Sequence, residues 1–335
     1  MPVDESAART NTVRPTAVPL ITHNPYFSVW SMADRLTDAP TTHWTGSAQP
    51  LCGLVRIDGQ TYRCLGNEPA TIGAMEQLAV EVRPTQTIYS FQAAGINLTL
   101  TFTSPLVPDD LEVLARPVTY LTWDVRAVDG RSHDVTIYFD VASLLAVNDP
   151  AQPVVWTRAQ VAGLDVLAAG SQEQPVLAKS GDNLRIDWGY LYLAVPKGDG
   201  ETTALGDASR LRAAFAANGA LPATDDLEMP RAAANRRTQR PALTCCLELG
   251  AVAQAPVSRH VLLAYDERYT VEYFGRKLRP YWRRDGLDAA GLLHQVEADY
   301  ATLLPLCSAR RWAVPAGQRP GLRRRGNVRG PPDAD

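Results

Sequence analysis

Residues 121–141, LTWDVRAVDGRSHDVTIYFDV, decide the fold class of this chain. On each side of a polar turn at 129–132, every second residue is apolar, from Leu121 to Ala127 and again from Val135 to Val141. Successive side chains of a strand point to opposite faces, so this period buries one face and leaves the other in water. The pattern is typical of antiparallel strands in a sandwich and differs from the continuous apolar runs of a buried parallel sheet.

The two-residue period recurs along most of the chain. It covers 96–103, and the same interpretation suits 184–195, 243–249 and 257–265. At 54–65, two runs flank Asp-Gly, a dipeptide that tolerates the positive φ angles of a tight hairpin turn. The sequence therefore predicts a mainly β protein built on a large antiparallel, supersandwich-like β-sandwich.

Two segments carry helical patterns instead. ASRLRAAFAA at 208–217 is followed by Asn-Gly, a helix stop, and predicts a short helical insert between strands. Residues 287–304 repeat apolar side chains every three or four positions, which predicts an amphipathic helix. Asp285 or Asp288 is expected to cap this helix, and Pro305 to end or kink it.

The order of these segments predicts four parts. A disordered amino terminus at 1–13 precedes a sandwich domain at 14–283, and the second helix forms a C-terminal connector at 284–306. Residues 307–335 are rich in Arg, Gly and Pro without an apolar period, so we expect a disordered tail. Two interpretations of this tail stay open, a basic tail for nucleic acid or acidic partners and an out-of-frame end in a GC-rich gene, and we favour the second.

Composition narrows the class of protein. The net charge of −3 and the pI near 6.0 favour neither nucleic acid nor an anionic membrane as a partner. No apolar stretch reaches the length of about 18 residues that a transmembrane helix needs. The first twenty residues contain acids and lack an apolar core, so no signal peptide is visible and the chain as written is expected in the cytoplasm.

The sequence predicts neither a metal site nor a cofactor. Its five cysteines form no Cys-x-x-Cys pair, so we interpret them as small buried hydrophobes, with a Cys52–Cys64 bridge as the alternative. No nucleophile elbow, phosphate-binding loop or His-Glu-x-x-His motif occurs. The histidines at 133, 260 and 294 are interpreted as solvated or hydrogen-bonded structural residues.

The most unusual segment is 14–46, RPTAVPLITHNPYFSVWSMADRLTDAPTTHWTG. Within about thirty residues it gathers four aromatic, two histidine and two aspartate side chains. One interpretation is a segment that lines a cleft for a polar substrate, with the aromatic rings as stacking platforms. The other is an irregular edge strand whose aromatic residues cover the sandwich. Composition alone leaves both open.

A resemblance to a known family rests on several stretches of the sequence. RPTAVPLITHNPYFSVWS at 14–31, followed by LTD and THWTG and then by PLCGLVRIDGQTYRCLG at 50–66, resembles the opening of the glutaminase A family. YDERYTVEYFGRKLRPYWRRDG at 265–286 resembles the junction between the domains of that family. The likeness covers 14–307 and fades after the second predicted helix.

The resemblance implies an architecture and an activity. Family members join an amino-terminal β-sandwich to a carboxy-terminal (α/α)6 toroid, similar in plan to several glycoside hydrolases, and hydrolyse L-glutamine to L-glutamate and ammonia. By that analogy the acid and base are toroid carboxylates, so we expect this chain to be a truncated hydrolase, inactive alone. Its natural partner would be the toroid, and a small polar substrate would bind only in the complete enzyme.

No catalytic residue is carried over from the family. The residues expected at the cleft or at the domain interface are His23, Tyr26, Trp30, His43 and Trp44.

Three alternatives stay open. The chain can be a non-catalytic carbohydrate- or peptide-binding sandwich module, which exposure of both Trp30 and Trp44 would favour and burial of both would oppose. It can be the amino-terminal domain of a glycoside-hydrolase-like enzyme. A small enzyme with its own site among Asp34, Asp38, His23 and His43 is the third alternative, although no spacing supports it.

Overall fold

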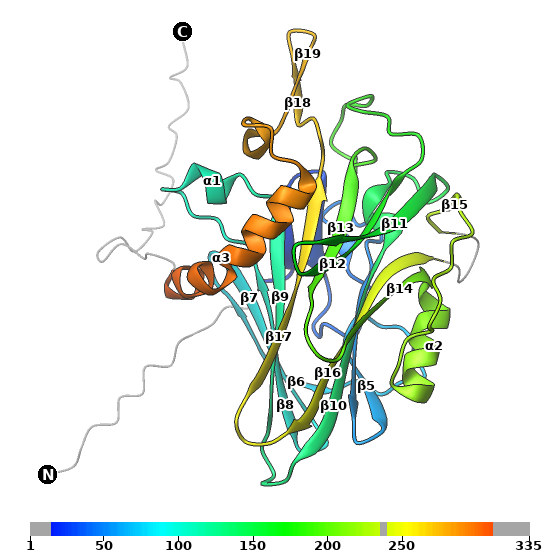
Figure 1. The fold of residues 1–335 in the computed structure, drawn as a ribbon, viewed down its shortest axis with the longest axis vertical. Helices are drawn as coiled ribbons and strands as arrows, with labels where there is room; N and C mark the ends of the chain where they lie inside the picture. The colour runs from blue at the N-terminus through cyan, green and yellow to red at the C-terminus, as the bar shows by residue number, and fades with distance from the viewer. Residues whose placement is uncertain (1–14, 235–239, 311–335) are drawn as a thin grey trace, which may run out of the picture.

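The computed structural model of this chain describes residues 15–234 and 240–310. Within these residues, two large antiparallel sheets pack face to face, and the predicted mainly β sandwich is confirmed (Figure 1). The smaller sheet has the order β14-β16-β10-β4-β5. Its strands are β4 (Leu51–Ile57), β5 (Gln60–Leu65), β10 (His133–Ala142), β14 (Glu201–Asp207) and β16 (Pro241–Val252).

The larger sheet has nine strands in the order β15-β11-β12-β13-β17-β9-β8-β7-β6. They are β6 (Glu76–Val82), β7 (Gln86–Ala93), β8 (Ile96–Thr103), β9 (Val118–Ala127), β11 (Pro153–Val161), β12 (Leu164–Ser171), β13 (Tyr190–Pro196), β15 (Arg231–Ala232) and β17 (Val257–Asp266). Two smaller sheets flank the sandwich. They contain β1 (Val18–Asn24), β2 (Phe27–Ser31) and β3 (Thr42–His43), and β18 (Val271–Tyr273) and β19 (Arg276–Leu278).

The predicted hairpin at 54–65 is confirmed as β4 and β5. Asp58 and Gly59 between them have φ angles of 46° and 86°, the positive values that a tight hairpin turn requires. The turn at 129–132 behaves differently, because it carries the chain from β9 in the large sheet to β10 in the small one. The two alternating runs that surround this turn therefore face each other across the core instead of pairing.

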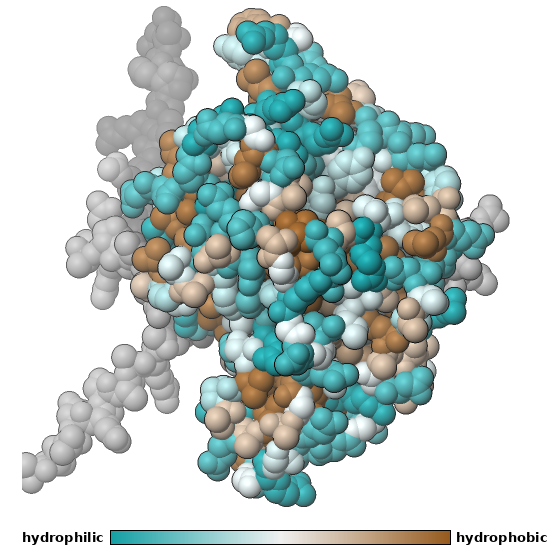
Figure 2. Space-filling view, in the orientation of Figure 1, coloured by the Kyte–Doolittle hydropathy of each residue, from teal (hydrophilic) through white to brown (hydrophobic). Residues whose placement is uncertain are grey.

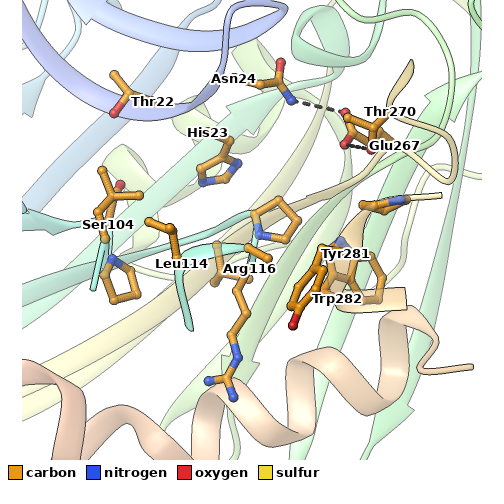
Figure 3. A pocket seen from close by; sticks show the side chains of 16 residues that line it. Thr22, His23, Asn24, Ser104, Leu114, Arg116, Glu267, Thr270, Tyr281 and Trp282 are labelled. Atoms are coloured by element: carbon orange, nitrogen blue, oxygen red, sulfur yellow. Dashed lines mark hydrogen bonds between the residues drawn. The ribbon is translucent and has the colours of Figure 1, made fainter. Parts of the chain in front are cut away.

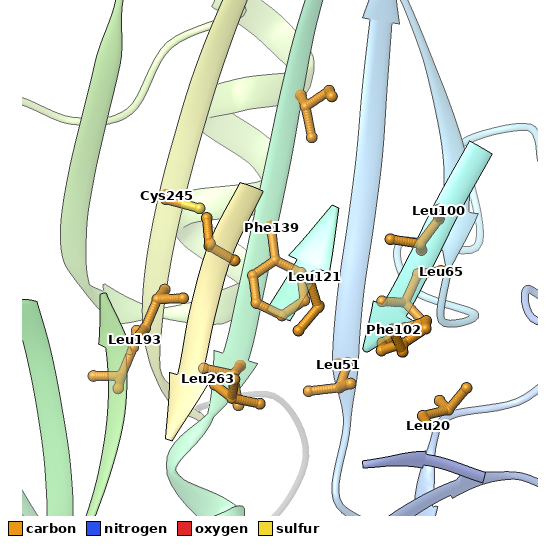
Figure 4. Packing of buried hydrophobic residues seen from close by; sticks show 14 of the residues in the cluster. Leu20, Leu51, Leu65, Leu100, Phe102, Leu121, Phe139, Leu193, Cys245 and Leu263 are labelled. Carbon is orange, nitrogen blue, oxygen red and sulfur yellow. The ribbon is translucent and has the colours of Figure 1, made fainter. Parts of the chain in front are cut away.

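The core lies between the two sheets (Figure 4). Trp123 of β9 and Phe139 of β10 meet there with ring centroids 5.6 Å apart, and both side chains are fully buried. Each such side chain contributes roughly 1.5–3 kcal/mol when it leaves water. The predicted alternation is therefore the feature that holds the two sheets together.

Helices cover the outer faces of both sheets, which gives four layers. Helix α2 (Ala208–Asn218), the predicted insert, packs Leu211 and Phe215 against the small sheet beside Tyr138. Helix α3 (Ala289–Ala309), the predicted C-terminal helix, packs against the large sheet. Two short helices, α1 (Leu111–Leu114) and η1 (Ser143–Ala146), and a 3-10 turn, η2 (Tyr281–Arg283), complete the described elements.

The first and last residues of α3 decide two predictions, the residue that caps its start and the residue at which it ends. Asp288 caps its start by accepting a hydrogen bond from the backbone N–H of Gly291. The helix does not end at Pro305 but continues to Ala309. The buried Cys307 anchors this last turn, and its carbonyl accepts a hydrogen bond from the Thr85 hydroxyl at 3.1 Å.

The prediction that a disordered tail begins at 307 is therefore wrong at its start, because residues 307–309 belong to α3. The rest of that prediction, from 311 on, and the predicted disorder of 1–13 lie outside the described residues. All five cysteines are buried and free, as small hydrophobes, and Cys52 and Cys64 form no bridge.

Candidate functional site

A pocket of about 250 Å³ lies at the end of the sandwich where α1 and η2 are found (Figure 3). Distant segments line it: the end of β1, the loops on either side of α1, the segment after β17, and η2. Among the five residues predicted from the sequence, His23 lines this pocket. The volume is below the roughly 300 Å³ at which drug-sized ligand sites begin, so it suits a small metabolite.

His23 is held as a neutral imidazole. Its Nε2 lies 3.0 Å from the hydroxyl of Thr119, and its ring stacks on Phe27 at 5.1 Å. Burial lowers the pKa of His23 to about 3, because removal from water disfavours the charged form. Its Nδ1 is buried and has no hydrogen-bond partner among the described residues. The ring therefore offers an unused nitrogen.

A second unused polar group belongs to Trp282 in η2. The indole is buried, the Arg283 guanidinium lies 4.6 Å from the ring centroid, and Nε1 has no partner within the described chain. Arg283 is itself paired with Asp266 at the end of β17, which fixes η2 against the large sheet. Leaving a buried N–H unpaired costs about 1–3 kcal/mol, so an acceptor that hydrogen-bonds to this N–H would be favourable.

Glu267 adds a buried carboxyl group to the pocket. Burial, together with the nearby charge of Asp266, raises the pKa of Glu267. Its two oxygens accept hydrogen bonds from Asn24 Nδ2 at 3.2 Å and from the Thr270 hydroxyl at 2.5 Å, the two bonds dashed in Figure 3. Asn24 also accepts from the backbone N–H groups of the β1–β2 turn, so one side chain connects this turn to the pocket acid.

Arg116 lines the pocket, but its charge is used elsewhere. Figure 3 shows its guanidinium extending away from His23 towards a helix. There it pairs with Asp299 of α3, with a nitrogen–oxygen distance of 2.7 Å. Arg116 therefore has a structural role, because its ion pair joins the α1–β9 loop to α3.

His43 and Trp44 meet at one carbonyl oxygen, that of Pro25. His43 Nε2 lies 3.0 Å from it and Trp44 Nε1 donates to it at 2.7 Å. A carbonyl only accepts, so Nε2 carries the proton, and Nδ1 faces the Thr45 hydroxyl at 2.9 Å. Burial also lowers the pKa of His43, which is therefore neutral.

Tyr26 and Trp30 are half-buried. The Tyr26 ring lies 6.2 Å from that of Trp188, and Trp30 Nε1 donates to the Ser28 hydroxyl. Neither residue lines the pocket, and neither do His43 and Trp44. Trp44 is 45% exposed while Trp30 is only half-buried, so the condition that would favour a platform made of both rings is not met.

Sequence reasoning missed Glu267 and Trp282 as site residues, although both lie in the stretch 265–286 that was quoted for its resemblance. The density of aromatic and charged side chains there was the available indication. In the described ranges, no group of three or more His, Cys, Asp or Glu is placed to hold a metal ion. No helix within those ranges is long and apolar enough to span a bilayer.

The β18–β19 hairpin begins beside the pocket, since Thr270 lines it, and projects from the sandwich at the top of Figure 1. Phe274 at its tip is 87% exposed and Tyr273 is 61% exposed. Phe274 has a φ of 48°, a left-handed value that is uncommon for a bulky residue. Figure 2 shows apolar and hydrophilic residues side by side on this projection.

The fold and the site thus define a mainly β protein with a small, partly unsatisfied polar pocket at one end of its sandwich. Two family models match it, both described as domains of unknown function: DUF4964 at residues 3–76 and DUF5127 at residues 85–310. Since the second match covers more than half of the sequence, the chain belongs to the DUF5127 family.

Two curated relatives carry the glutaminase name. Glutaminase A of Aspergillus oryzae is 29% identical over 229 residues, which are 66% of this chain and 33% of the relative. A protein of Arthroderma benhamiae named probable glutaminase is 25% identical over 237 residues, which are 63% of this chain and 26% of the relative. The expected resemblance to the glutaminase A family is confirmed, and the chain spans about a third or less of the length of these relatives.

Proposed function

We propose that this chain forms the β-sandwich part of a glutaminase-like amidohydrolase and that its pocket supplies one wall of the substrate site. The observation that carries the proposal is the pair of unused polar atoms, His23 Nδ1 and Trp282 Nε1, around one small pocket. The similarity to glutaminase A over 66% of the chain supports the choice of substrate class.

A carboxamide complements these two atoms. The indole N–H of Trp282 can donate to the amide oxygen. When His23 Nε2–H donates to the Thr119 hydroxyl, Nδ1 is left with a lone pair that can accept from the amide NH2 group. The neutral state of His23 is required for this role, because an imidazolium has two donors and no acceptor.

The pocket binds and orients in this proposal, and the groups that cleave the amide come mainly from outside the sandwich. Arg116 is paired and Glu267 is held by two hydrogen bonds. The exposed tip of the β18–β19 hairpin is the expected contact with the additional length that the relatives have.

An ammonia-release assay tests the catalytic half of the proposal. The purified 335-residue chain is incubated with L-glutamine beside glutaminase A of Aspergillus oryzae as the positive control. We expect no ammonia above the enzyme-free background from the chain. Sustained turnover that His23→Phe and Trp282→Phe abolish would show that the described residues hold a complete active site, against this proposal.

Titration by NMR tests the binding half. L-Glutamine is expected to shift the indole N–H resonance of Trp282, which is assigned by its loss in Trp282→Phe, at millimolar concentrations. L-Leucine, which lacks the amide, is expected to leave that resonance in place. Trp44→Phe is the matched control, because Trp44 Nε1 is occupied by Pro25 and lies outside the pocket. An unmoved Trp282 resonance in saturating L-glutamine would refute substrate binding at this pocket.

A further inference from the structure

A second hollow, of about 480 Å³, lies on the outer face of the large sheet, away from the His23 pocket. Its polar lining comes from three adjacent strands: Ser90 of β7, Asn97 and Thr99 of β8, and Asp124 and Arg126 of β9. Helix α3 covers the neighbouring part of the same face, where Tyr300 meets Thr122. The hollow therefore lies on the part of that sheet face that α3 does not cover.

The register of the strands arranges these groups as a small grid. Asp124 is directly opposite Thr99, which is opposite Ser90, and Arg126 is directly opposite Asn97. Asp124 and Arg126 are two residues apart on one strand, so they share a face and their Cα atoms are roughly 7 Å apart. An anionic and a cationic group thus stand side by side on β9, each next to a polar residue of β8, Thr99 beside Asp124 and Asn97 beside Arg126.

Neither charge is neutralised within the described residues. Asp124 and Arg126 make no side-chain hydrogen bond or ion pair there, although they are neighbours on one face, whereas Arg83 and Glu81, two residues apart on another segment, pair at 2.7 Å. The Oδ1 atom of Asn97 is buried and also has no partner in the described chain. Leu78, 49% exposed, and Pro256 add apolar sides. Opposite charges that do not pair with each other remain available to a ligand.

We propose that this groove binds a short zwitterionic peptide, with its ammonium group on Asp124 and its carboxylate on Arg126. Two residues of extended chain span up to roughly 7 Å, which matches the spacing of the two side chains on β9. The peptide group between the termini would face Asn97 and Thr99, an amide and a hydroxyl that can donate and accept. Guanidinium binds carboxylate in a two-pronged geometry, which favours Arg126 for that end.

The groove fits a sugar less well. Carbohydrate platforms present an open aromatic face, but the aromatic residue of this hollow, Phe91, is buried under it. A neutral polyol would also leave both Asp124 and Arg126 without a counter-charge. The proposal stands apart from the glutaminase-like function, because it uses another face of the sheet and none of the residues of the His23 pocket.

Calorimetric titration of the full chain with Ala-Ala tests the proposal, with N-acetyl-Ala-Ala-amide and maltose as the comparison ligands. We expect saturable binding of Ala-Ala in the millimolar range or tighter, and at least tenfold weaker binding of the blocked peptide and of maltose. Binding of maltose or of the blocked peptide with equal or higher affinity would overturn it, and so would the absence of Ala-Ala binding.

Variants locate the binding. Asp124→Asn and Arg126→Gln are each expected to weaken Ala-Ala binding at least tenfold while the midpoint of thermal unfolding stays within a few degrees of the wild type. The matched controls are Asp182→Asn and Arg210→Gln, two exposed residues outside the groove, which should bind as the wild type does. Unchanged affinity in Asp124→Asn and Arg126→Gln would place the peptide elsewhere and refute the assignment.

Discussion

His23 and His133 lie in different parts of the sandwich, and their environments are opposite. His23, at the pocket, has a hydroxyl on one nitrogen and nothing on the other. His133, at the start of β10, lies between Asp58, 2.6 Å from Nδ1, and Asp129, 3.0 Å from Nε2. The hydrogen bonds that His133 donates to these two carboxylates raise its pKa, whereas burial lowers that of His23.

The difference shows that limited exposure alone does not decide the charge of a histidine. His133 is only 4% exposed, yet it is favoured as a cation because it can donate to two anions. The pKa of Asp58 is lowered in return by its hydrogen bond from His133. The turn region thus holds a charged cluster that ties three segments together, whereas the His23 ring at the pocket is neutral.

The largest expected effect comes from His23→Phe, which keeps a ring against Phe27 and removes the titration. His23 is neutral in the fold and takes up a proton below pH 6.5 only in the unfolded chain, so it costs the wild type stability as pH falls from 6.5 towards 3. Below pH 3 the loss is on the order of 5 kcal/mol for a pKa of about 3. Urea unfolding measured from pH 7 to 4 should show that the free energy of unfolding of the variant increases relative to that of the wild type as pH falls. If the free energies of unfolding of variant and wild type changed in parallel with pH, His23 would not be neutral in the folded protein.

An intermediate and opposite effect is expected for His133→Gln. Because the folded pKa is raised, the charged ring stabilises the fold fully below pH 6.5 and this contribution is lost as pH rises through the folded pKa. The variant should therefore unfold several degrees below the wild type at pH 5.5, and the gap should narrow at pH 9. His294→Gln, at an exposed position of α3, serves as the control for loss of a histidine elsewhere in the fold. A gap that widens with pH would exclude the charged cluster.

The smallest effect is expected for Glu267→Gln, which preserves the shape of the pocket acid. A carboxyl whose pKa is raised by burial destabilises the fold once pH passes its unfolded value and the group must ionise. The variant should therefore be more stable than the wild type at pH 8, and this difference should disappear near pH 4. Thermal unfolding at both pH values measures it, with the exposed Glu173→Gln as the control. A variant less stable at pH 8 than at pH 4, relative to the wild type, would show that Glu267 acts as an anion.

Sequence reasoning went furthest where the physics is local. Alternation at 121–127 and 135–141 and the Asp58-Gly59 turn depend on neighbouring residues, and they predicted strands and a hairpin that the structure contains. The alternation does not encode which sheet a strand joins. The turn at 129–132 looks like a hairpin turn in the sequence, but it crosses between sheets because β10 pairs with β4 and β16.

The candidate site shows the same limit. His23 was chosen because it stands in an aromatic-rich segment, and it does line the pocket. Its companions Glu267 and Trp282 are about 240 and 260 positions away. They meet it because β1 contacts β9 through His23 and Thr119 and contacts the segment after β17 through Asn24 and Glu267. The interpretation of 14–46 as one lining segment remains a prediction for Tyr26, Trp30, His43 and Trp44. A pocket assembled from both ends of a chain cannot be found from residue spacing.

The central place of β10 in the smaller sheet also has a consequence for synthesis. This strand pairs with β4 on one side and β16 on the other. The ribosome synthesises β4, which begins at Leu51, long before β10, and β16, which ends at Val252, long after it. While the ribosome adds that second partner, β10 has an unpaired edge of alternating apolar residues, the kind of surface on which nascent chains aggregate. We therefore expect the nascent chain to be prone to aggregation until β16, which ends at Val252, has been made.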